Sequence, residues 1–378
     1  MSDGAAPERA DLEKAQGATG QTYWSIVRTQ FRKNRQGMVG LWIVLAIVVI
    51  AVLAPLLAND RPIVCVYKGA LRFPAFTTYV DNWVPWQDAR FKLKSFEVGG
   101  SFPFSDHYAE LEGKSWKQAA ETEPDAFGSP TVWPPIRFNP RQFDTTAIKK
   151  PPLVDGHVLG TDDQGRDVLA RIVHGCVVAI TVGVLAMGIA TLIGVALGLA
   201  AGYYGGWIDL VLSRVVEIVM CFPTFFLIIS VIAFVPPSIV NIMLVIGFVS
   251  WTGIFRLTRG EVLKARAQEY VTAAEALAIP QRSIMFRHIL PNSVAPVFVS
   301  VAFGIASAVL TESSLSFLGF GDPNASSWGE VVSQGRKYVA EGLTHLVLAP
   351  GFAIFVTLTA FNLFGQGLRD AMDPRLRR

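Results

Sequence analysis

The sequence predicts an all-α membrane protein with six transmembrane helices. Of its 378 residues, 51% are hydrophobic and only 17% are charged, whereas a soluble globular domain is about one quarter charged. The mean hydropathy is +0.40, and the apolar residues gather in long runs without Asp, Glu, Lys or Arg. A helix needs about 20 apolar residues to cross the hydrocarbon core of a bilayer. Repeated runs of this length predict a chain that crosses the membrane several times.

The N-terminal part of the chain predicts an arm followed by a first span. Residues 1–21 are polar and small, and we expect a disordered cytoplasmic arm there. An amphipathic lead and the first span occupy residues 22–58, because no charged residue lies between Arg35 and Asp60. This run has no small-residue cleavage site and is longer than the core of a signal peptide, so we interpret it as a retained anchor.

Five further spans follow from the remaining charge-free intervals. These intervals run from Arg171 to Asp209, from Glu217 to Arg256, from His288 to Glu312 and from Glu341 to Arg369. The second of them is too long for one helix, and Pro236-Pro237-Ser238 divides it into two spans joined by a tight turn. We expect Pro350-Gly351 to interrupt the last span.

The basic residues predict the orientation of these spans, because Lys and Arg are enriched in cytoplasmic loops. They are frequent before the first span, in residues 256–288 and in the C-terminal tail, whereas residues 312–341 hold two bases and four acids. We therefore expect both termini and the 256–288 loop in the cytoplasm. The insert at residues 59–156 then lies outside, and its many aromatic residues indicate an ordered subdomain or an elaborated loop, since disordered linkers are poor in aromatics.

Several classes of function are excluded by what the sequence lacks. There is no G-x-x-x-x-G-K-[ST] phosphate loop, so the chain is not expected to hydrolyse ATP, and no H-E-x-x-H or G-x-S-x-G motif occurs. The three cysteines, Cys65, Cys176 and Cys221, form no C-x-x-C pair, so we expect neither a metal site nor a redox site. The net charge of +3 is too small to suggest nucleic acid binding. We identify no catalytic residue.

Gly194, Gly198 and Gly202 are spaced by four residues in the second span, and they therefore share one helix face. Small residues on one face let another helix approach closely. Two interpretations remain open. The glycines pack against a helix of the same chain, or they pack against another subunit.

The stretch from His157 to Leu169, just before the second span, contains several Asp and Gly residues. Its spacing does not fit the calcium-loop pattern D-x-[DN]-x-[DN]-G with a later Glu. We interpret it as a capped turn, in which Arg166-Asp167 begin an interfacial helix that enters the membrane.

Glu312 stands at the end of the fifth span, about 31 Å along the helix from Pro291. This distance places the carboxylate close to the outer hydrocarbon boundary. It is either an interfacial carboxylate in water or a group that lines the outer mouth of a substrate pathway, because acids within membranes usually face a wet cavity.

The segment at residues 269–291 (EYVTAAEALAIPQRSIMFRHILP) carries the most information about function. Alanines crowd its first half, Pro280 breaks it, and a basic second helix follows. A small-residue helix followed by a break and a basic helix can lie along a membrane face and insert into a groove on a partner. The segment resembles the "EAA" loop of binding-protein-dependent ABC importers, the part of the permease that docks on the ATPase.

Further motifs extend this resemblance to residues 22–58 and 157–378. They include LGTDDQGRDVLARIVHG at 159–175, SLSFLGFGDP at 314–323 and FNLFGQGLRDAMDPRL at 361–376. In the same order they are similar to the inner-membrane permease subunit of dipeptide and oligopeptide ABC importers, the C-type branch. Within that branch, ANDRPIVCVYKGALRFPAF at 58–76 and VWPPIRF at 132–138 are most similar to the Yej-type permease, which is linked to oligopeptides and to the peptide–nucleotide antibiotic microcin C.

The resemblance implies the type I ABC importer permease fold, with a permease core at residues 157–378 and a cytoplasmic docking loop at 256–291. It implies that ATPase docking involves Glu269, Tyr270, Thr272, Ala273, Ala274, Glu275, Ala278, Leu290 and Pro291. Thr272 replaces the Glu of the motif and Ala278 replaces its Gly. We expect alanine at this position to favour a straight helix over a bend.

The resemblance also implies the partners and the location of the chain. A second, homologous permease forms the other half of the pathway, separate ATPase subunits bind ATP and magnesium, and a periplasmic binding protein delivers the peptide. The chain would lie in lipid as a multi-pass protein of the bacterial inner membrane, hold no cofactor itself and bind no nucleic acid. We expect the 59–156 insert to help form the docking surface for the binding protein.

Two other classes of protein would also have six spans and an external insert. A stand-alone channel or receptor with an external sensor domain does not explain the 269–291 segment. An export permease would need an exporter-style ATPase interface and no binding protein.

Overall fold

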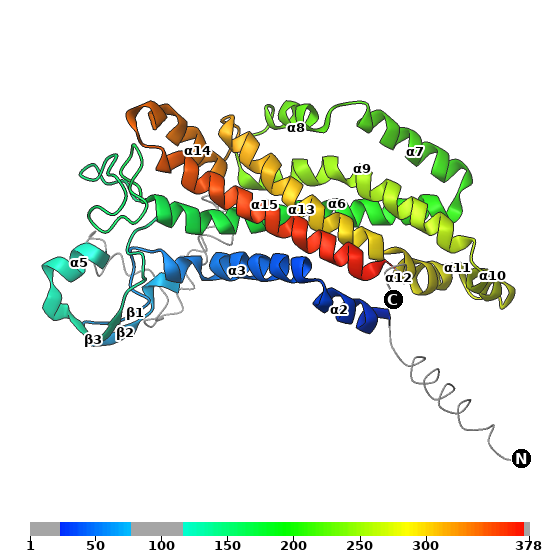
Figure 1. The fold of residues 1–378 in the computed structure, drawn as a ribbon, viewed down its shortest axis with the longest axis horizontal. Coiled ribbons are helices and arrows are strands. Elements are labelled where there is room, and N and C mark those ends of the chain that lie inside the picture. Colours follow the sequence, from blue (N-terminus) through cyan, green and yellow to red (C-terminus); the bar gives the residue numbers. More distant parts are fainter. Residues whose placement is uncertain (1–22, 77–115, 374–378) are drawn as a thin grey trace, which may run out of the picture.

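The computed structural model describes residues 23–76 and 116–373, and these are mostly helical. Five long helices lie side by side in an elongated bundle (Figure 1). They are α3 (Arg35–Leu57), α6 (Val168–Tyr204), α9 (Ile239–Arg266), α13 (Ala295–Phe317) and α15 (His345–Met372). Each of the five is long and apolar enough to cross a membrane. The expected disordered arm at residues 1–21 lies outside the described residues.

The expected third span is two helices rather than one. Helix α7 (Gly206–Met220) and helix α8 (Thr224–Ile232) are bent by 82° at a short break. Pro223 lies at this break; proline lacks an amide hydrogen and disfavours the helical conformation of the residue before it. The structure therefore has five candidate spans in the described residues, or six if this bent pair is counted as one. The expected turn at Pro236-Pro237 is confirmed, because α9 begins after it.

Pro350 does not interrupt the last span, contrary to the expectation. Helix α15 runs without a break from His345 to Met372 and contains Pro350. A proline near the start of a helix removes only the hydrogen bond to the carbonyl four residues earlier, which here is that of Leu346. In a packed bundle, neighbouring helices offset such a loss.

Helices α6 and α9 form the most extensive helix–helix contact among the described residues, and the glycines of α6 lie between them. A Cβ atom added at Gly194 would lie 2.6 Å from Cβ of Ile254, and one at Gly198 would lie 2.8 Å from the backbone oxygen of Phe255. At Gly202 it would lie 2.8 Å from Val262. The three glycines therefore face a helix of the same chain, which their small size lets approach closely.

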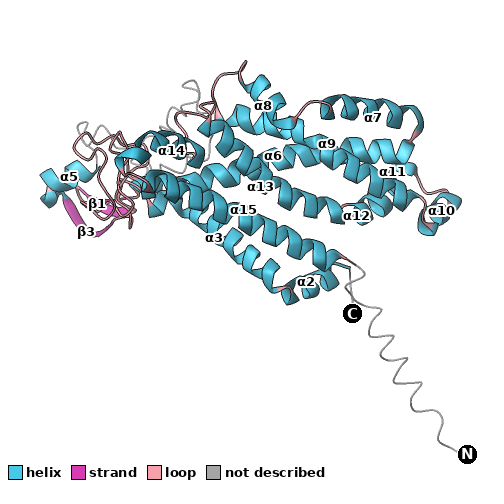
Figure 2. Ribbon diagram, turned by 45° about the horizontal axis from the view of Figure 1, so that its top comes forward, coloured by secondary structure: helices cyan, strands magenta, loops and turns pink. Residues whose placement is uncertain are grey.

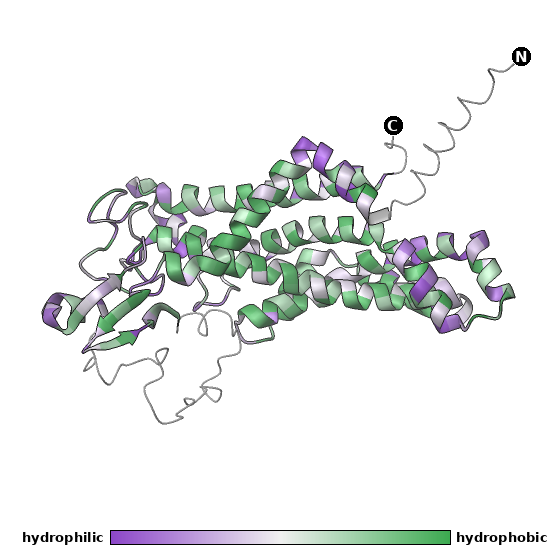
Figure 3. Cartoon of the chain, turned by 90° about the horizontal axis from the view of Figure 1, so that it is seen from below, coloured by the Kyte–Doolittle hydropathy of each residue, from purple (hydrophilic) through white to green (hydrophobic). Residues whose placement is uncertain are grey.

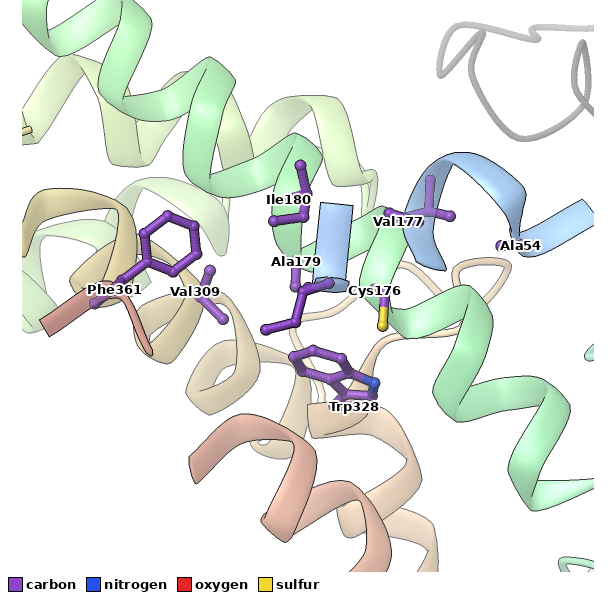
Figure 4. Close-up of a cluster of buried hydrophobic side chains, with 11 residues drawn as sticks. Ala54, Cys176, Val177, Ala179, Ile180, Val309, Trp328 and Phe361 are labelled. Carbon is purple, nitrogen blue, oxygen red and sulfur yellow. The ribbon is translucent and has the colours of Figure 1, made fainter. Parts of the chain in front are cut away.

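The core of the bundle lies where α3, α6, α13 and α15 meet the short helix α14 (Trp328–Gly335). Figure 4 shows residues of this cluster, with Cys176 close to the indole of Trp328 and Phe361 at the far side of the cluster. The indole Nε1 donates a hydrogen bond to the carbonyl of Ile172 at 3.0 Å. A buried tryptophan thus keeps its polar atom satisfied and fixes α14 against α6.

The fold is not entirely α-helical, because a small sheet lies in the insert. Strands β1 (Val64–Tyr67), β2 (Ala70–Arg72) and β3 (Phe127–Val132) are antiparallel in the order β2-β1-β3. Lys68 and Gly69, between β1 and β2, both have positive φ, as the two central residues of a tight hairpin turn require. The β-branched and aromatic residues of Val64–Tyr67 favour a strand, although no secondary structure was expected there.

The sheet has its own core, completed by short helices. The 3₁₀ turn η1 (Pro74–Phe76) follows β2, and helix α5 (Trp116–Thr122) and the turn η2 (Pro124–Ala126) precede β3. Cys65, Tyr67, Trp116 and Ala119 are buried together. Burial raises the pKa of the Cys65 thiol to about 11. The described part of the insert is therefore a small α/β layer rather than an open loop.

The remaining short elements lie at the two ends of the bundle, where Figure 3 shows the hydrophilic residues that flank its apolar middle. The turn η4 (Arg336–Glu341) follows α14 at the end that carries the sheet. At the opposite end lie α2 (Tyr23–Lys33), α10 (Glu269–Ala276), α11 (Gln281–Ser283), the π-helical turn η3 (Ile284–Ile289) and α12 (Leu290–Ser293). Figures 1 and 2 place the sheet and the 269–291 segment at opposite ends of the molecule.

Candidate functional site

The 269–291 segment is a short helix followed by a sharp turn and a second helical stretch. Helix α10 ends at Ala276, and the amide of Ile279 donates to the carbonyl of Ala274 at 3.2 Å. The amide of Ala278 donates to the carbonyl of Glu275 at 2.9 Å. These two bonds form a Schellman motif, which satisfies carbonyls that the end of a helix leaves without partners.

Ala278 corrects one expectation, because it does not straighten the segment. Its φ is +54°, in the left-handed region that glycine adopts without a steric penalty. The helix has to end here, since Pro280 disfavours the helical conformation at the residue before it. The bend is therefore kept although alanine replaces glycine, at a cost in backbone strain of about 1 kcal/mol.

One face of the segment is seated on α6 and α9 through apolar contacts. Val271 and Ala274 of α10 are buried together with Ile284, Met285 and Ile289 of the second stretch. Their partners in this cluster are Leu199, Tyr203, Val262 and Ala265. We call these nine residues the apolar seat. The seat fixes the segment to the ends of α6 and α9, the two helices with the most extensive contact in the bundle.

The opposite face of the segment is exposed. Of the nine residues expected to bind an ATPase, Ala274 is buried and Leu290 is half-buried against the apolar seat. The other seven are exposed: Glu269, Tyr270, Thr272, Ala273, Glu275, Ala278 and Pro291. The exposed alanines leave a shallow surface between the carboxylates of Glu269 and Glu275, which a partner can approach closely. Around it, Arg282 and Arg287 are exposed.

The helices beneath the segment are tied together by charged side chains. Arg259 of α9 forms two hydrogen bonds with Asp209 of α7, and the one from Nη2 to Oδ2 is 2.6 Å long. The guanidinium of Arg266 lies 5.9 Å from the ring centroid of Tyr203, a residue of the apolar seat. A displacement of α10 would therefore reach α6, α7 and α9 together.

At the other end of the bundle, the expected capped turn is confirmed. The Asp167 carboxylate accepts a hydrogen bond from the amide of Ala170 at 2.6 Å and caps the helix. The helix that begins after Arg166-Asp167 is α6 itself, which has 37 residues and forms the expected second span. His157 Nδ1 lies 2.8 Å from Asp167 Oδ2. Burial raises the pKa of the Asp167 carboxyl, against the effect of its hydrogen bonds.

The same turn holds a buried charge cluster that sequence reasoning missed. Arg166 Nε and Arg171 Nη1 each lie 2.7 Å from Oδ2 of Asp162, and all three residues are buried. Gln334 of α14 accepts hydrogen bonds from both arginines, at 2.6 and 2.7 Å. Glu330 lies 3.7 Å from Arg171. We call these five residues the charge cluster. Arg171 and Gln334 are 163 positions apart in the chain, so no local pattern connects them.

Glu312 is buried rather than surrounded by water. It is 2% exposed, and its Oε1 accepts a hydrogen bond from Ser316 at 2.7 Å. The interpretation as an interfacial carboxylate in water is therefore wrong for this conformation. The other interpretation, that it lines a substrate pathway, stays a prediction.

A hydroxyl-lined groove lies between α6, α8, α9 and α13. Its volume is about 170 Å³, and it is lined by Thr224, Ser250, Ser300, Ser307 and Thr311 among apolar side chains. Hydroxyl groups within otherwise apolar helices offer both donors and acceptors to a polar solute. The signal in the sequence is the presence of Ser and Thr in charge-free spans, which sequence reasoning did not use.

No group of three or more His, Cys, Asp or Glu side chains that could hold a metal ion occurs in residues 23–76 and 116–373. The described residues form a helical bundle with the exposed small-residue helix α10 at one end and the layer that holds the charge cluster at the other. It provides surfaces and a groove rather than reacting groups.

Comparison with known proteins identifies relatives of this chain. Residues 194–378 match the family described as binding-protein-dependent transport system inner membrane component, and residues 22–64 match the N-terminal TM domain of oligopeptide transport permease C. The dipeptide transport system permease protein DppC of Alkalihalophilus pseudofirmus is 40% identical over 58% of this chain and 73% of its own length.

Two relatives align with nearly the whole chain. The peptidoglycan transport system permease protein YejE of Agrobacterium fabrum is 30% identical, over 91% of this chain and 91% of its own length. The inner membrane ABC transporter permease protein YejE of Escherichia coli is 32% identical, over 91% of this chain and 95% of its own length.

Proposed function

Because the chain belongs to the family of binding-protein-dependent transport system inner membrane components, we propose that it forms half of the pathway of an ATP-driven peptide importer. In this proposal it is the permease subunit, and ATP hydrolysis takes place on partner chains. The observation that carries the proposal is the exposed alanine face of α10, seated at the end of a membrane-spanning bundle.

The proposed partners on the cytoplasmic side are ABC ATPase subunits that bind ATP and magnesium. ATP must favour one conformation of the assembly over another for its binding to drive transport. In the proposal, closure of the ATPases displaces α10, and the apolar seat passes this displacement to α6 and α9. The exposed residues Thr272, Ala273 and Glu275 would contact the ATPase.

A second, homologous permease is the proposed partner within the membrane. Helix α7 supports this partner, because it exposes large apolar residues on several faces while the bundle covers only a small part of it. The exposed residues of α7 include Trp207, Ile208, Leu210, Val211, Val215 and Ile218. Lipid would cover one side of such a helix, and we assign the other side to the second permease.

The proposed orientation places both termini and the 269–291 segment in the cytoplasm. It rests on the basic residues of α2, of which Arg28, Arg32 and Lys33 are exposed. The insert then lies in the periplasm, where its sheet and the charge cluster form a layer that we assign to the binding protein. Exposed apolar residues of the 139–158 stretch, such as Phe143 and Leu153, support this contact.

Peptides are the proposed substrates. The names of the relatives include dipeptide, oligopeptide and peptidoglycan transport, and the two YejE proteins align over the insert as well as the core. We assign this chain to the Yej type, with oligopeptides as substrates and peptide–nucleotide conjugates of the microcin C kind as a narrower possibility within the same class. A stand-alone channel or receptor has no ATPase partner, so it would not explain the exposed face of α10.

The test is to place a charge on the exposed face of α10 by Ala273→Glu. The tagged chain is produced with the second permease, the ATPases and the binding protein, and retention of the ATPases is measured during purification in mild detergent. A carboxylate in a closely packed interface should lower the retained ATPase and the peptide uptake by about tenfold or more.

Ala340→Glu is the matched control, because Ala340 is also exposed but lies in η4 at the opposite end of the bundle. It should leave ATPase retention unchanged, whatever it does to contacts with the binding protein. If both variants retain the ATPases equally, or if the unchanged chain purifies without any ATPase, α10 is not the docking helix and the proposal fails.

A further inference from the structure

A cavity of about 610 Å³ lies between α7 and α9, nearer to the C-terminal end of α9 than the hydroxyl-lined groove. Residues of α7 and its C-terminal end form one wall, and Phe255, Arg256 and Arg259 of α9 form the other. Figures 1 and 2 both show α7 running beside α9 along this stretch. A volume of several hundred Å³ is typical of sites that hold a small ligand.

The groove and the cavity follow one another along α9. Ser250 and Gly253 line the groove, and Arg256 lines the cavity. Gly253 and Arg256 are three residues apart and are therefore neighbours on one face of the helix. On the other wall, Thr224 of α8 borders the groove and Met220 of α7 borders the cavity. The bend between α7 and α8 thus lies beside the point where one space follows the other.

The charged groups around the cavity are paired except for Arg256. Arg259 is held by Asp209, and Glu217 is held by Arg214. Arg256 forms no ion pair with any of the described residues, and its one hydrogen bond runs from Nη1 to the sulfur of Met220 at 3.6 Å. A thioether is a weak acceptor. Most of the guanidinium donors therefore remain available to a ligand in the cavity.

A guanidinium in this position selects for a planar anion. Arg stays charged in proteins and presents two parallel N–H groups that match a carboxylate. The surrounding walls add Val216, Met220 and the buried Phe255, which suit an apolar side chain. Ionisable side chains within membrane helices usually face a wet cavity and mark substrate pathways.

We propose that Arg256 binds the terminal carboxylate of the transported peptide in the inner half of the pathway. The inference rests on the proposed function as a peptide permease. It adds a recognition step within the permease, on a peptide that has already left the binding protein. In the same cavity, the apolar wall would hold the side chain next to that carboxylate.

The experiment uses the complete importer in liposomes, with two peptides of the same sequence. One has a free C-terminal carboxylate and the other a C-terminal amide. The measured quantity is the ratio of their uptake rates, compared among the unchanged chain, Arg256→Gln and Arg256→Lys. All three share one binding protein, so its own preference cancels when the ratios are compared.

Arg256→Gln should lower the ratio of carboxylate to amide uptake by about tenfold, because a charge-assisted hydrogen bond is lost only for the free carboxylate. Arg256→Lys should restore most of the ratio. Lys264→Gln is the matched control, since Lys264 is a cation of the same helix that does not line the cavity, and it should leave the ratio unchanged. Uptake of the amide peptide by Arg256→Gln shows that this variant is folded and assembled.

Two results would overturn the inference. The first is that Arg256→Gln leaves the ratio unchanged. The second is that it lowers the uptake of both peptides alike, as the loss of a contact to a lipid phosphate or to the second permease would. In either case, uptake by the unchanged importer would leave the proposed function standing. If the unchanged importer takes up neither peptide, both proposals fail.

Discussion

The two ends of the helix bundle are stabilised by different kinds of interaction. At the end with the sheet, the buried Arg166 and Arg171 donate hydrogen bonds to the buried Asp162 and to Gln334 of α14. At the other end, the 269–291 segment is held by the apolar seat, and its polar residues are exposed. The first end is fixed by directional bonds between parts of the chain that are distant in sequence, whereas the 269–291 segment is attached to its helices mainly by apolar contact.

The difference indicates how each end can respond to a partner. A buried charge cluster adds little net stability, but every departure from its geometry leaves a charge without a partner, which is costly. Apolar contacts have no preferred direction, and small shifts of packed helices keep most of them. The layer that holds the charge cluster, which we call the platform, is therefore fixed in its geometry. The 269–291 segment can shift by a small amount and still keep most of its contacts with the apolar seat.

The largest expected effect is at the charge cluster. Arg171→Met should destabilise the protein by about 3–5 kcal/mol, because it leaves the buried Asp162 carboxylate with one cation fewer. The fraction that stays monodisperse after heating in detergent measures this loss. Arg214→Met removes an arginine from an exposed ion pair and should cost less than about 1 kcal/mol. Equal losses in the two variants would show that the platform does not depend on buried charge.

A smaller and more local effect is expected in the apolar seat. Ile289→Ala removes a fully buried side chain and should cost about 2–5 kcal/mol. The loss should be confined largely to the segment, so amide hydrogen exchange should rise in residues 269–291 and not in the platform. Phe286→Ala in the same turn changes an exposed ring and should have little effect. If exchange rises equally at both ends, the two ends are a single cooperative unit and the comparison is wrong.

The smallest expected effect concerns the bend at Ala278. Ala278→Gly should stabilise the segment by up to about 1 kcal/mol, because glycine adopts positive φ without the clash of a Cβ atom. Ala273→Gly lies in the middle of α10 and should destabilise it by about 0.5–1 kcal/mol. Hydrogen exchange of the α10 amides should therefore become slower in Ala278→Gly and faster in Ala273→Gly. Changes of the same sign would mean that backbone strain at Ala278 does not limit the segment.

The spans and the cap of α6 could be predicted because they depend on local sequence. A charge-free run identifies a membrane helix wherever it occurs, and an Asp just before an apolar run, as at Asp167, identifies a cap. The bend of 82° between α7 and α8 could not be foreseen in the same way, because counting charges across Pro223 ignores the break that proline imposes. At Ala278 helix propensity predicted the wrong outcome, because Pro280 two residues later decides where the helix ends.

Other features depend on residues that are distant in the sequence. In the sequence Arg171 marks only the border of a charge-free run. Its burial in the charge cluster could not be predicted, because its partner Gln334 belongs to another helix. The sheet around Cys65 could not be predicted from the sequence, because β1 pairs with β3 (Phe127–Val132), which lies at least sixty residues further along the chain. The burial of Glu312 follows from the serines that surround it and from the helices packed on α13. Sequence patterns report periodicity and charge, whereas these contacts are set by the tertiary fold.

The length of helix α6 has a mechanical consequence, because the helix connects the two ends of the bundle. Its 37 residues span about 55 Å, well beyond the roughly 30 Å of a hydrocarbon core. Asp167 and Arg171 hold one end in the platform, and Leu199 and Tyr203 hold the other in the apolar seat. Helix α6 is thus a single stiff rod, with one end fixed in the platform and the other end beneath α10. A tilt imposed at the α10 end would move that end of α6 most and the platform end least, so the part of α6 beside the hydroxyl-lined groove would move by an intermediate amount.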